Sequence, residues 1–191
     1  MTTAVMYDSS GFITAVRTGR ASAVEIDAQA SGQSYLLTED DIDLDRFYVN
    51  VSENELVEYP SKPSEAHVFN FTSASWELDL TEAKALAWNR IKRDRDQDEF
   101  GEFVWNTHTF QCDEVSQRRI QGAVQLAQLD STTSIDWTLA DNSTETFNSV
   151  ELKEIGQALA AHVDSCHVKA RGLRNQINAA QNEAELELIT W

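Results

Sequence analysis

The chain has 191 residues, 41% of them hydrophobic, with seven glycines and two prolines. This composition is typical of a globular protein with one substantial core or two small ones, and it excludes disorder as the default state. The formal net charge of −17 argues against binding to duplex nucleic acid or to anionic membranes, because both kinds of binding depend on lysine and arginine side chains.

The sequence carries no signal for membrane insertion or export. No stretch approaches eighteen continuous apolar residues, and the start, MTTAVMYDSS, lacks the basic and then apolar order of a secretion signal. We therefore expect the protein to be made in the cytoplasm and not to insert into a membrane. Cys112 and Cys166 are far apart in the sequence, and we expect both to be reduced thiols with structural roles.

Residues 1–80 are dominated by short extended segments that polar turns separate. The first hairpin turns through a Ser-Ser-Gly sequence ending at Gly11, where glycine supplies the positive φ that such turns often require. Residues 19–32 are open between a third strand and a single helical turn. The predicted strands lie in segments 3–18, 34–38, 46–59 and 67–79. Together they predict a β-meander domain over residues 1–80.

Two features of this region suggest binding sites but have simpler interpretations. Residues 39–45 contain five carboxylates, yet they lack the central glycine and the closing glutamate of a calcium loop, which favours a solvated acidic loop. Phe71 and Trp76 belong to the last predicted hairpin of the region. We interpret them as core residues rather than as a ligand platform, because aromatic side chains fill cores far more often than they line sites.

Residues 81–98 predict a helix with one apolar face. Thr81 is placed to cap the first turn, and the charge of Glu82 suits the same end. Basic side chains at positions 90–95 are interrupted and followed by acidic ones at helical spacing. This pattern indicates a solvated face laced with salt bridges rather than an anion site.

The stretch that follows combines a hairpin with a capped helix. Residues 102–111 alternate aromatic and polar side chains around a short turn, which predicts two paired strands. Asp113 then predicts the helix start, because its carboxylate can accept hydrogen bonds from the N–H groups near Val115 and Ser116. The apolar face of this helix contains Ile120, Ala123, Val124 and Ala127.

The last third predicts another hairpin, over residues 135–147, and a long helix to about residue 180. Asn148 begins the helix, and Glu151 completes a pattern like a capping box. Two series of small and apolar residues recur every seven positions and form a seam. We favour packing of this seam within the chain, against 81–98 and 114–129, over packing against a second copy. The two series are Leu152, Leu159, Cys166, Leu173 and Ala180, and Gly156, Val163, Ala170, Ile177 and Ala184.

No residue pattern predicts catalysis, a cofactor site or a metal site. His162, Cys166 and His167 are the one cluster of metal-ligand types, but zinc normally needs three or four protein ligands, so we interpret them as two helix-surface histidines and a seam cysteine. A glycosidase needs a pair of carboxylates, and so many acids make any chosen pair uninformative. The sequence motifs of serine hydrolases, zinc proteases and phosphate-binding loops are missing.

The order of motifs in the last three-fifths of the chain resembles a domain of unknown function that is common in tailed bacteriophages and usually ends tail-fibre or tail-associated proteins. The sequence departs from the usual pattern at Thr107, where glycine is expected, and at Cys112, where a small polar residue is common. The resemblance rests on Trp88, Ile91, Lys92, Arg95, Asp96, Gly101, Phe103, Trp105, Phe110, Asp113, Ser116, Gln117, Ile120, Gln121, Gly122, the segment 137–142, Ala160, Ala161, His162, Ile177, Ala180 and Trp191.

The resemblance implies a virion context and no reaction. We expect an α+β protein of two parts: a β-rich docking domain at residues 1–80, and a helix-hairpin-helix domain of tail-associated type at residues 81–191. The expected function is that of a structural, non-enzymatic tail component of the fibre, baseplate or tail tip, assembled in the host cytoplasm and located in the virion. The alternative is a fibre-assembly chaperone that is absent from the mature particle.

The expected partners are other phage tail proteins. We expect the protein to bind neither nucleic acid nor a cofactor. We also expect a homo-oligomer. The resemblance favours a trimer, because tail fibres are commonly trimeric, and the seam of the long C-terminal helix offers one surface for association. We further expect the terminal Trp191 to lie in the core.

Overall fold

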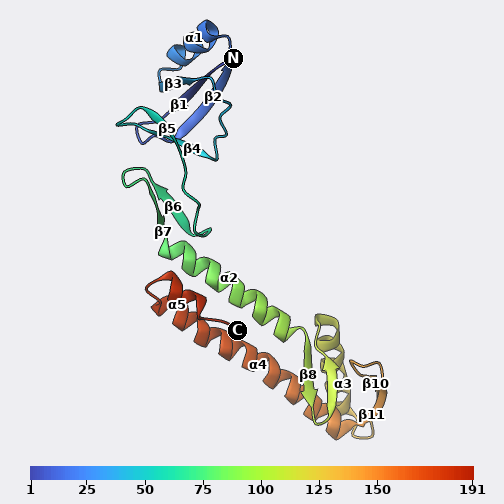
Figure 1. Ribbon diagram of the computed structural model, residues 1–191. Helices are drawn as coiled ribbons and strands as arrows, with labels where there is room; N and C mark the ends of the chain where they lie inside the picture. Colours follow the sequence, from blue (N-terminus) through green and yellow to red (C-terminus); the bar gives the residue numbers. More distant parts are fainter. The chain divides into compact units, whose positions relative to one another are not determined.

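The computed structural model describes residues 1–191, and the chain forms two compact units, Met1–Asp79 and Leu80–Trp191. Strands and hairpins dominate the first unit, whereas the second combines helices with two hairpins and contains the long helix near the C-terminus (Figure 1). The predicted α+β class is therefore confirmed. No helix combines the length and the apolar character that crossing a membrane would require.

A three-stranded antiparallel sheet forms the first part of Met1–Asp79. Its strands are β1 (Thr2–Tyr7), β2 (Ile13–Gly19) and β3 (Ser34–Thr38), in the order β2-β1-β3. Between β2 and β3 the chain forms α1 (Ala21–Ser31), which ends at Gly32 in the left-handed conformation. The segment that was open between a strand and one helical turn is thus an eleven-residue helix, as its four alanines permit.

The sheet buries side chains on both faces. On one face Ala4 and Met6 pack with Val24 and Ala28 of α1. On the other face Val5 packs with Tyr7, Ile13 and Val49. This division follows from the strand geometry, because successive side chains of β1 point to opposite faces. The central strand is consequently buried almost throughout.

Two further hairpins complete this unit, and each pairs only with itself. They are β4 (Phe47–Asn50) with β5 (Glu55–Glu58), and β6 (His67–Asn70) with β7 (Ser75–Leu78). The predicted strands and hairpins of this region are therefore confirmed, but they form a three-stranded sheet and two separate hairpins in place of a simple meander. The crossover through α1 places β1 between β2 and β3, and the proline-containing segment 60–63 separates the two hairpins.

The two hairpins share an aromatic cluster. Tyr48 packs against Phe69 with tilted rings whose centroids are 4.8 Å apart, and Tyr59 meets Phe69 edge to face at 4.6 Å. Phe71 and Trp76 join the cluster but remain half-buried. The prediction of core aromatics thus describes their contacts correctly, although the cluster is only partly enclosed.

The second unit begins with α2 (Leu80–Glu99), followed by the hairpin β8 (Glu102–Trp105) and β9 (His108–Gln111). The helix starts one residue before Thr81. The predicted cap is therefore wrong in position, since Thr81 lies inside the first turn. Next comes α3 (Glu114–Leu129), whose start is capped as predicted.

Asp113 is the N-cap of α3. Its Oδ1 accepts hydrogen bonds from the N–H groups of Val115, at 2.9 Å, and Ser116, at 3.1 Å. The Ser116 hydroxyl also donates to Oδ2, at 2.7 Å. These bonds lower the pKa of the Asp113 carboxyl, the largest cause being the Ser116 hydroxyl.

The chain then forms β10 (Ser134–Thr138), β11 (Thr144–Asn148), α4 (Ser149–Ala179) and α5 (Glu183–Glu187). The start of α4 has the predicted capping box: Asn148 accepts from the N–H of Glu151, and the Glu151 carboxylate accepts from the N–H of Asn148. One buried cluster joins the hairpins to α3 and α4. It contains Phe103, Phe110, Cys112, Ile120, Ala123, Ala127, Leu139, Phe147, Leu152, Ile155 and Leu159.

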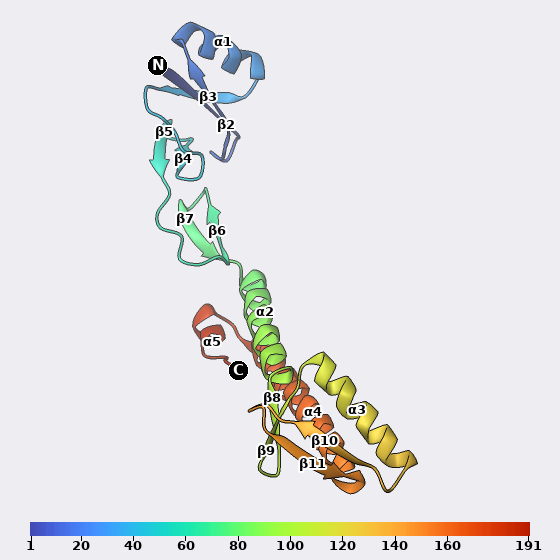
Figure 2. The ribbon, with the colours of Figure 1, turned by 90° about the vertical axis from the view of Figure 1, so that its right-hand side faces the viewer.

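The long helix α4 packs within the chain along its length. Its N-terminal half lies beside α3 and its C-terminal half beside α2 (Figures 1 and 2). The Nζ of Lys84 donates to the carbonyl of Asn178, and His162 Nε2 lies 3.1 Å from the carbonyl oxygen of Asp98, so α2 and α4 run antiparallel. The favoured interpretation of the seam, as an intramolecular one, is confirmed for α4, whereas Ala184 lies beyond that helix, exposed in α5.

The C-terminal segment closes over α2. Arg90 donates hydrogen bonds to the carbonyls of Leu186 and Ile189, at 3.0 and 2.9 Å. The prediction that Trp191 enters the core is wrong. Its ring is only half-buried, its Nε1 donates to Asp98 Oδ2 at 3.0 Å, and the Lys169 ammonium lies 4.3 Å from the ring centroid.

Candidate protein-docking groove

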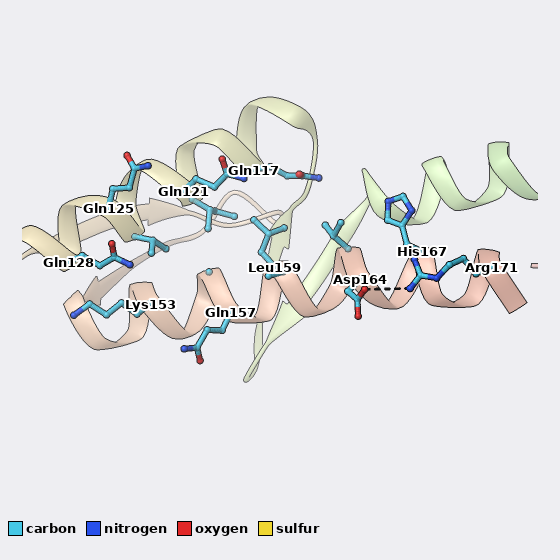
Figure 3. Close-up of a pocket in the computed structure, with 15 residues that line it drawn as sticks. Gln117, Gln121, Gln125, Gln128, Lys153, Gln157, Leu159, Asp164, His167 and Arg171 are labelled. Atoms are coloured by element: carbon cyan, nitrogen blue, oxygen red, sulfur yellow. Dashed lines mark ion pairs between the residues drawn. The ribbon is translucent and has the colours of Figure 1, made fainter.

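A groove of about 1030 Å³ runs between α3 and α4. In Figure 3, Gln128 of α3 lies near Lys153 of α4 at one end, while Gln117 lies toward Leu159. The two helices therefore run antiparallel. The groove continues along α4 beyond α3, as far as Arg171.

The two walls meet closely because α4 has no side chain at the point of contact. A Cβ built on Gly156 would lie only 2.5 Å from Val124 Cγ2 of α3. Any larger residue at position 156 would push α3 away. Gly156 of the predicted seam therefore packs within the chain, where the absence of a side chain lets α3 and α4 approach closely.

The bottom of the groove is apolar and its sides are rich in amides. The apolar residues are Ile120, Val124, Leu159, Ala160 and Val163. The amides are Gln117, Gln121, Gln125 and Gln128 on α3, and Gln157 on α4 (Figure 3). Steps of three and four residues place the α3 glutamines along one stripe of the helix.

These amides can both donate and accept hydrogen bonds. Gln117 is already engaged, since its Nε2 donates to the carbonyl of Cys112 at 3.0 Å. The other glutamines of α3 are exposed. A partner whose side chains donate or accept hydrogen bonds would therefore meet hydrogen-bonding groups at the sides of the groove and apolar surface at its bottom.

The charged residues of the groove are mostly basic. Lys153 lies at one end, and Arg171 and His167 at the other. Asp164 is the one carboxylate, and it lies 3.8 Å from Arg171 in an exposed ion pair (Figure 3). His167 Nε2 lies 3.3 Å from Glu99 Oε2. The groove is thus a region without excess negative charge on a chain of net charge −17.

The residues that were considered for a metal site are engaged separately. His162 contacts the Asp98 carbonyl, His167 pairs with Glu99, and Cys166 is buried. No group of three or more histidine, cysteine, aspartate or glutamate side chains converges anywhere in the chain in a way that would hold a metal ion.

Both thiols are unpaired and buried. Burial raises the pKa of the Cys112 thiol to about 11, and it also raises the pKa of the Cys166 thiol. The thiolate is the nucleophilic form of cysteine. These shifts therefore favour packing, not reactivity, as the role of both residues.

The sequence did not predict this groove. The four glutamines of α3 recur at helical spacing along one edge of the predicted apolar face, a signal that is readable in the sequence. Polar stripes of this kind are usually solvated. The second wall, from Lys153 to Arg171, became visible only when folding placed α4 beside α3.

The fold defines the chain as an α+β protein whose second unit combines helices and hairpins around an open interhelical groove. A family model described as Domain of unknown function (DUF4376) matches residues 82–190. The chain therefore belongs to this family. No curated protein and no solved structure matches it.

Proposed function

We propose that the protein is a structural, non-enzymatic component of a bacteriophage tail, in the fibre, baseplate or tail tip, that acts through contacts with other tail proteins. The observation that carries the contact role is the groove between α3 and α4, with its apolar bottom and amide sides. The tail context is supported by the resemblance of the last three-fifths of the sequence to tail-associated proteins. The corresponding location is the virion tail, after assembly in the host cytoplasm.

The groove suits a helix better than an extended segment. Both of its walls are α-helices, whose main-chain N–H and C=O groups are bonded within each helix. An extended segment lying on the apolar bottom would bury main-chain groups without partners, which is costly. An amphipathic helix satisfies its own backbone and presents apolar side chains at intervals of three and four residues.

The charges of the groove indicate the chemistry of that helix. Lys153 has no ion-pair partner within the chain, whereas Asp164 and Arg171 pair with each other. A carboxylate on the partner helix opposite Lys153 would give this lysine an ion-pair partner. Because exposed ion pairs contribute little, we expect this contact to set the orientation of the helix, while burial of Val124, Ala160 and Val163 supplies most of the affinity.

We also propose that the protein is a homo-oligomer, with a trimer favoured by the tail-fibre resemblance. Most of the seam of α4 packs against α2 and α3, so we expect the interface between copies to use other surfaces. Sedimentation at high protein concentration tests this proposal. A protein that stays monomeric there, and that also enters particles as single copies, would contradict it.

Mass spectrometry of purified virions tests the tail assignment. A tail component is expected at a stoichiometry close to that of known structural proteins in the same particles. Complete absence from mature particles, with the protein present during assembly, would overturn the assignment and identify the alternative, a fibre-assembly chaperone.

A further inference from the structure

The strand β3 lies at an edge of the three-stranded sheet in Met1–Asp79. It pairs with β1 from Thr38 to Ser34 in regular antiparallel register, and no strand pairs with its other side. The main-chain groups of an edge strand that point away from the sheet have no ladder partner. No other main-chain hydrogen bond of the chain engages residues Ser34–Thr38.

A cleft of about 700 Å³ runs along this edge. One wall is β3 itself, from Tyr35 to Thr38, and the other wall is formed by Asn54, Glu55 and Leu56, at the start of β5. Asp40 also lines it. The free edge therefore faces a hollow with a second wall instead of open solvent.

The edge lacks the features that usually protect edge strands. Natural edges are blunted by proline, by lysine, by inward-pointing charges or by a bulge. The sequence of β3 is SYLLT, and its register with β1 has no irregularity. Leu37 is 40% exposed on it. An unprotected edge beside a cleft is the arrangement that strand addition uses.

We propose that this cleft accepts an extended, basic segment of a partner protein, which pairs with β3 as a fourth strand of the sheet. Alternate side chains of the added strand would lie over Leu36 and Leu56, which favours apolar residues at those positions. The lining also includes the carboxylates of Asp40 and Glu55, and no lysine or arginine lines the cleft. Lysine or arginine elsewhere in the added strand is therefore favoured.

Charge also distinguishes this partner from a second copy of the chain. Residues 1–79 contain 14 acidic and 4 basic side chains, a net charge of −10. An equally acidic strand from another copy would bring like charges together, which is unfavourable. A basic segment is attracted by the same field. This proposal concerns the first unit and does not depend on the groove between α3 and α4.

The test uses the isotope-labelled full chain and a synthetic peptide of about eight residues, a usual strand length, in which valine and lysine alternate. We expect resonance shifts and slower amide exchange confined to Ser34–Thr38 and to residues 54–56. A second peptide carries N-methyl groups on alternate amides, which removes the donors that would pair with β3. A third peptide has glutamate in place of lysine. Both are expected to bind at least about tenfold more weakly, a difference of roughly 1.4 kcal/mol.

A pair of variants separates the cleft from the general acidity of the unit. Glu55→Lys places a positive charge in the cleft and is expected to weaken binding of the valine–lysine peptide several-fold. Glu65→Lys makes the same change at an exposed position outside the cleft and is expected to leave binding unchanged. Unaffected β3 amides, equal binding of the N-methylated peptide, or equal effects of the two variants would each overturn the proposal.

Discussion

The two units of the chain differ in how they bury apolar side chains and in what they leave exposed. In Leu80–Trp191 one cluster of eleven buried residues joins two hairpins to α3 and α4. In Met1–Asp79 the sheet separates two clusters of four buried residues each, and the aromatic cluster beside them is only partly enclosed. The first unit leaves a strand edge exposed, where the proposed partner would pair with the main chain. The second leaves a groove between helices, where the proposed partner would contact side chains.

The largest expected effect tests the difference between the cores. Phe110 is fully buried in the cluster of eleven, so Phe110→Ala should destabilise the second unit by about 3–5 kcal/mol. Phe71 is half-buried in the aromatic cluster, and Phe71→Ala should cost only about 1.5 kcal/mol. Denaturant unfolding measures the loss of stability in both variants. The circular dichroism of the helices reports on the first variant, and amide exchange of β1 reports on the second. Equal losses of stability in the two variants would show that the enclosed and the open cluster do not differ in how much each phenylalanine stabilises its unit.

A backbone substitution tests how tightly the first unit is assembled. Gly11 has a φ of +100°, and a Cβ on it would lie 2.0 Å from the carbonyl oxygen of Val49. Gly11→Ala should therefore cost about 3 kcal/mol, through backbone strain and overpacking together. Gly32 also has a positive φ but faces open space, so Gly32→Ala should cost only about 1 kcal/mol. Amide exchange of β1 in the two variants checks the difference, and similar values would show that the contact with Val49 is not rigid.

The start of α4 should matter to the second unit more than the start of α5. Asn148→Ala removes the side-chain half of a capping box on a helix of 31 residues and should cost about 1–2 kcal/mol of global stability. Asn182 caps a helix of five residues. Asn182→Ala should fray that end without moving the global denaturation midpoint. A global effect of the second substitution as large as that of the first would show that α5 belongs to the cooperative core.

The smallest effect concerns pH. In the folded state the pKa of Asp113 lies below its ordinary value of 3.8, mainly because the Ser116 hydroxyl donates to it. A depressed carboxyl pKa stabilises the fold above the ordinary value, and this contribution is lost as the pH falls through the lowered pKa. The difference in stability between the wild type and Asp113→Ala should therefore narrow at acidic pH. A difference that is constant over that interval would show that the charge of Asp113 adds nothing to its hydrogen bonds.

The features that could be predicted from the sequence depend on nearby residues. The caps at Asp113 and Asn148 were predictable because a short side chain and the following N–H groups decide them. The hairpins were predictable for a similar reason, since alternation and turn residues lie within about a dozen positions. The start of α2 was missed by one residue, at a boundary where Leu80 and Thr81 are both compatible with a helix.

The features that could not be predicted depend on contacts between distant segments. The position of β1 in the middle of its sheet follows from the crossover through α1, a segment whose sequence was compatible with either strand or helix. Trp191 is only half-buried and contacts Asp98 and Lys169, both distant in sequence. The groove needs the alignment of α3 with α4, which the contact between Gly156 and Val124 fixes.

The most direct measurement compares two neighbouring substitutions on α4. Both alanines are exposed, but Ala160 lines the groove and Ala161 lies outside it. Particles are assembled with Ala160→Arg, with Ala161→Arg or with the wild-type protein, and quantitative mass spectrometry counts the copies in each purified virion. A charged side chain at position 160 would block a partner helix from the apolar bottom of the groove. The number of copies per virion should therefore fall about tenfold for Ala160→Arg and should equal the wild-type number for Ala161→Arg. Equal incorporation of the two variants would contradict docking through the groove.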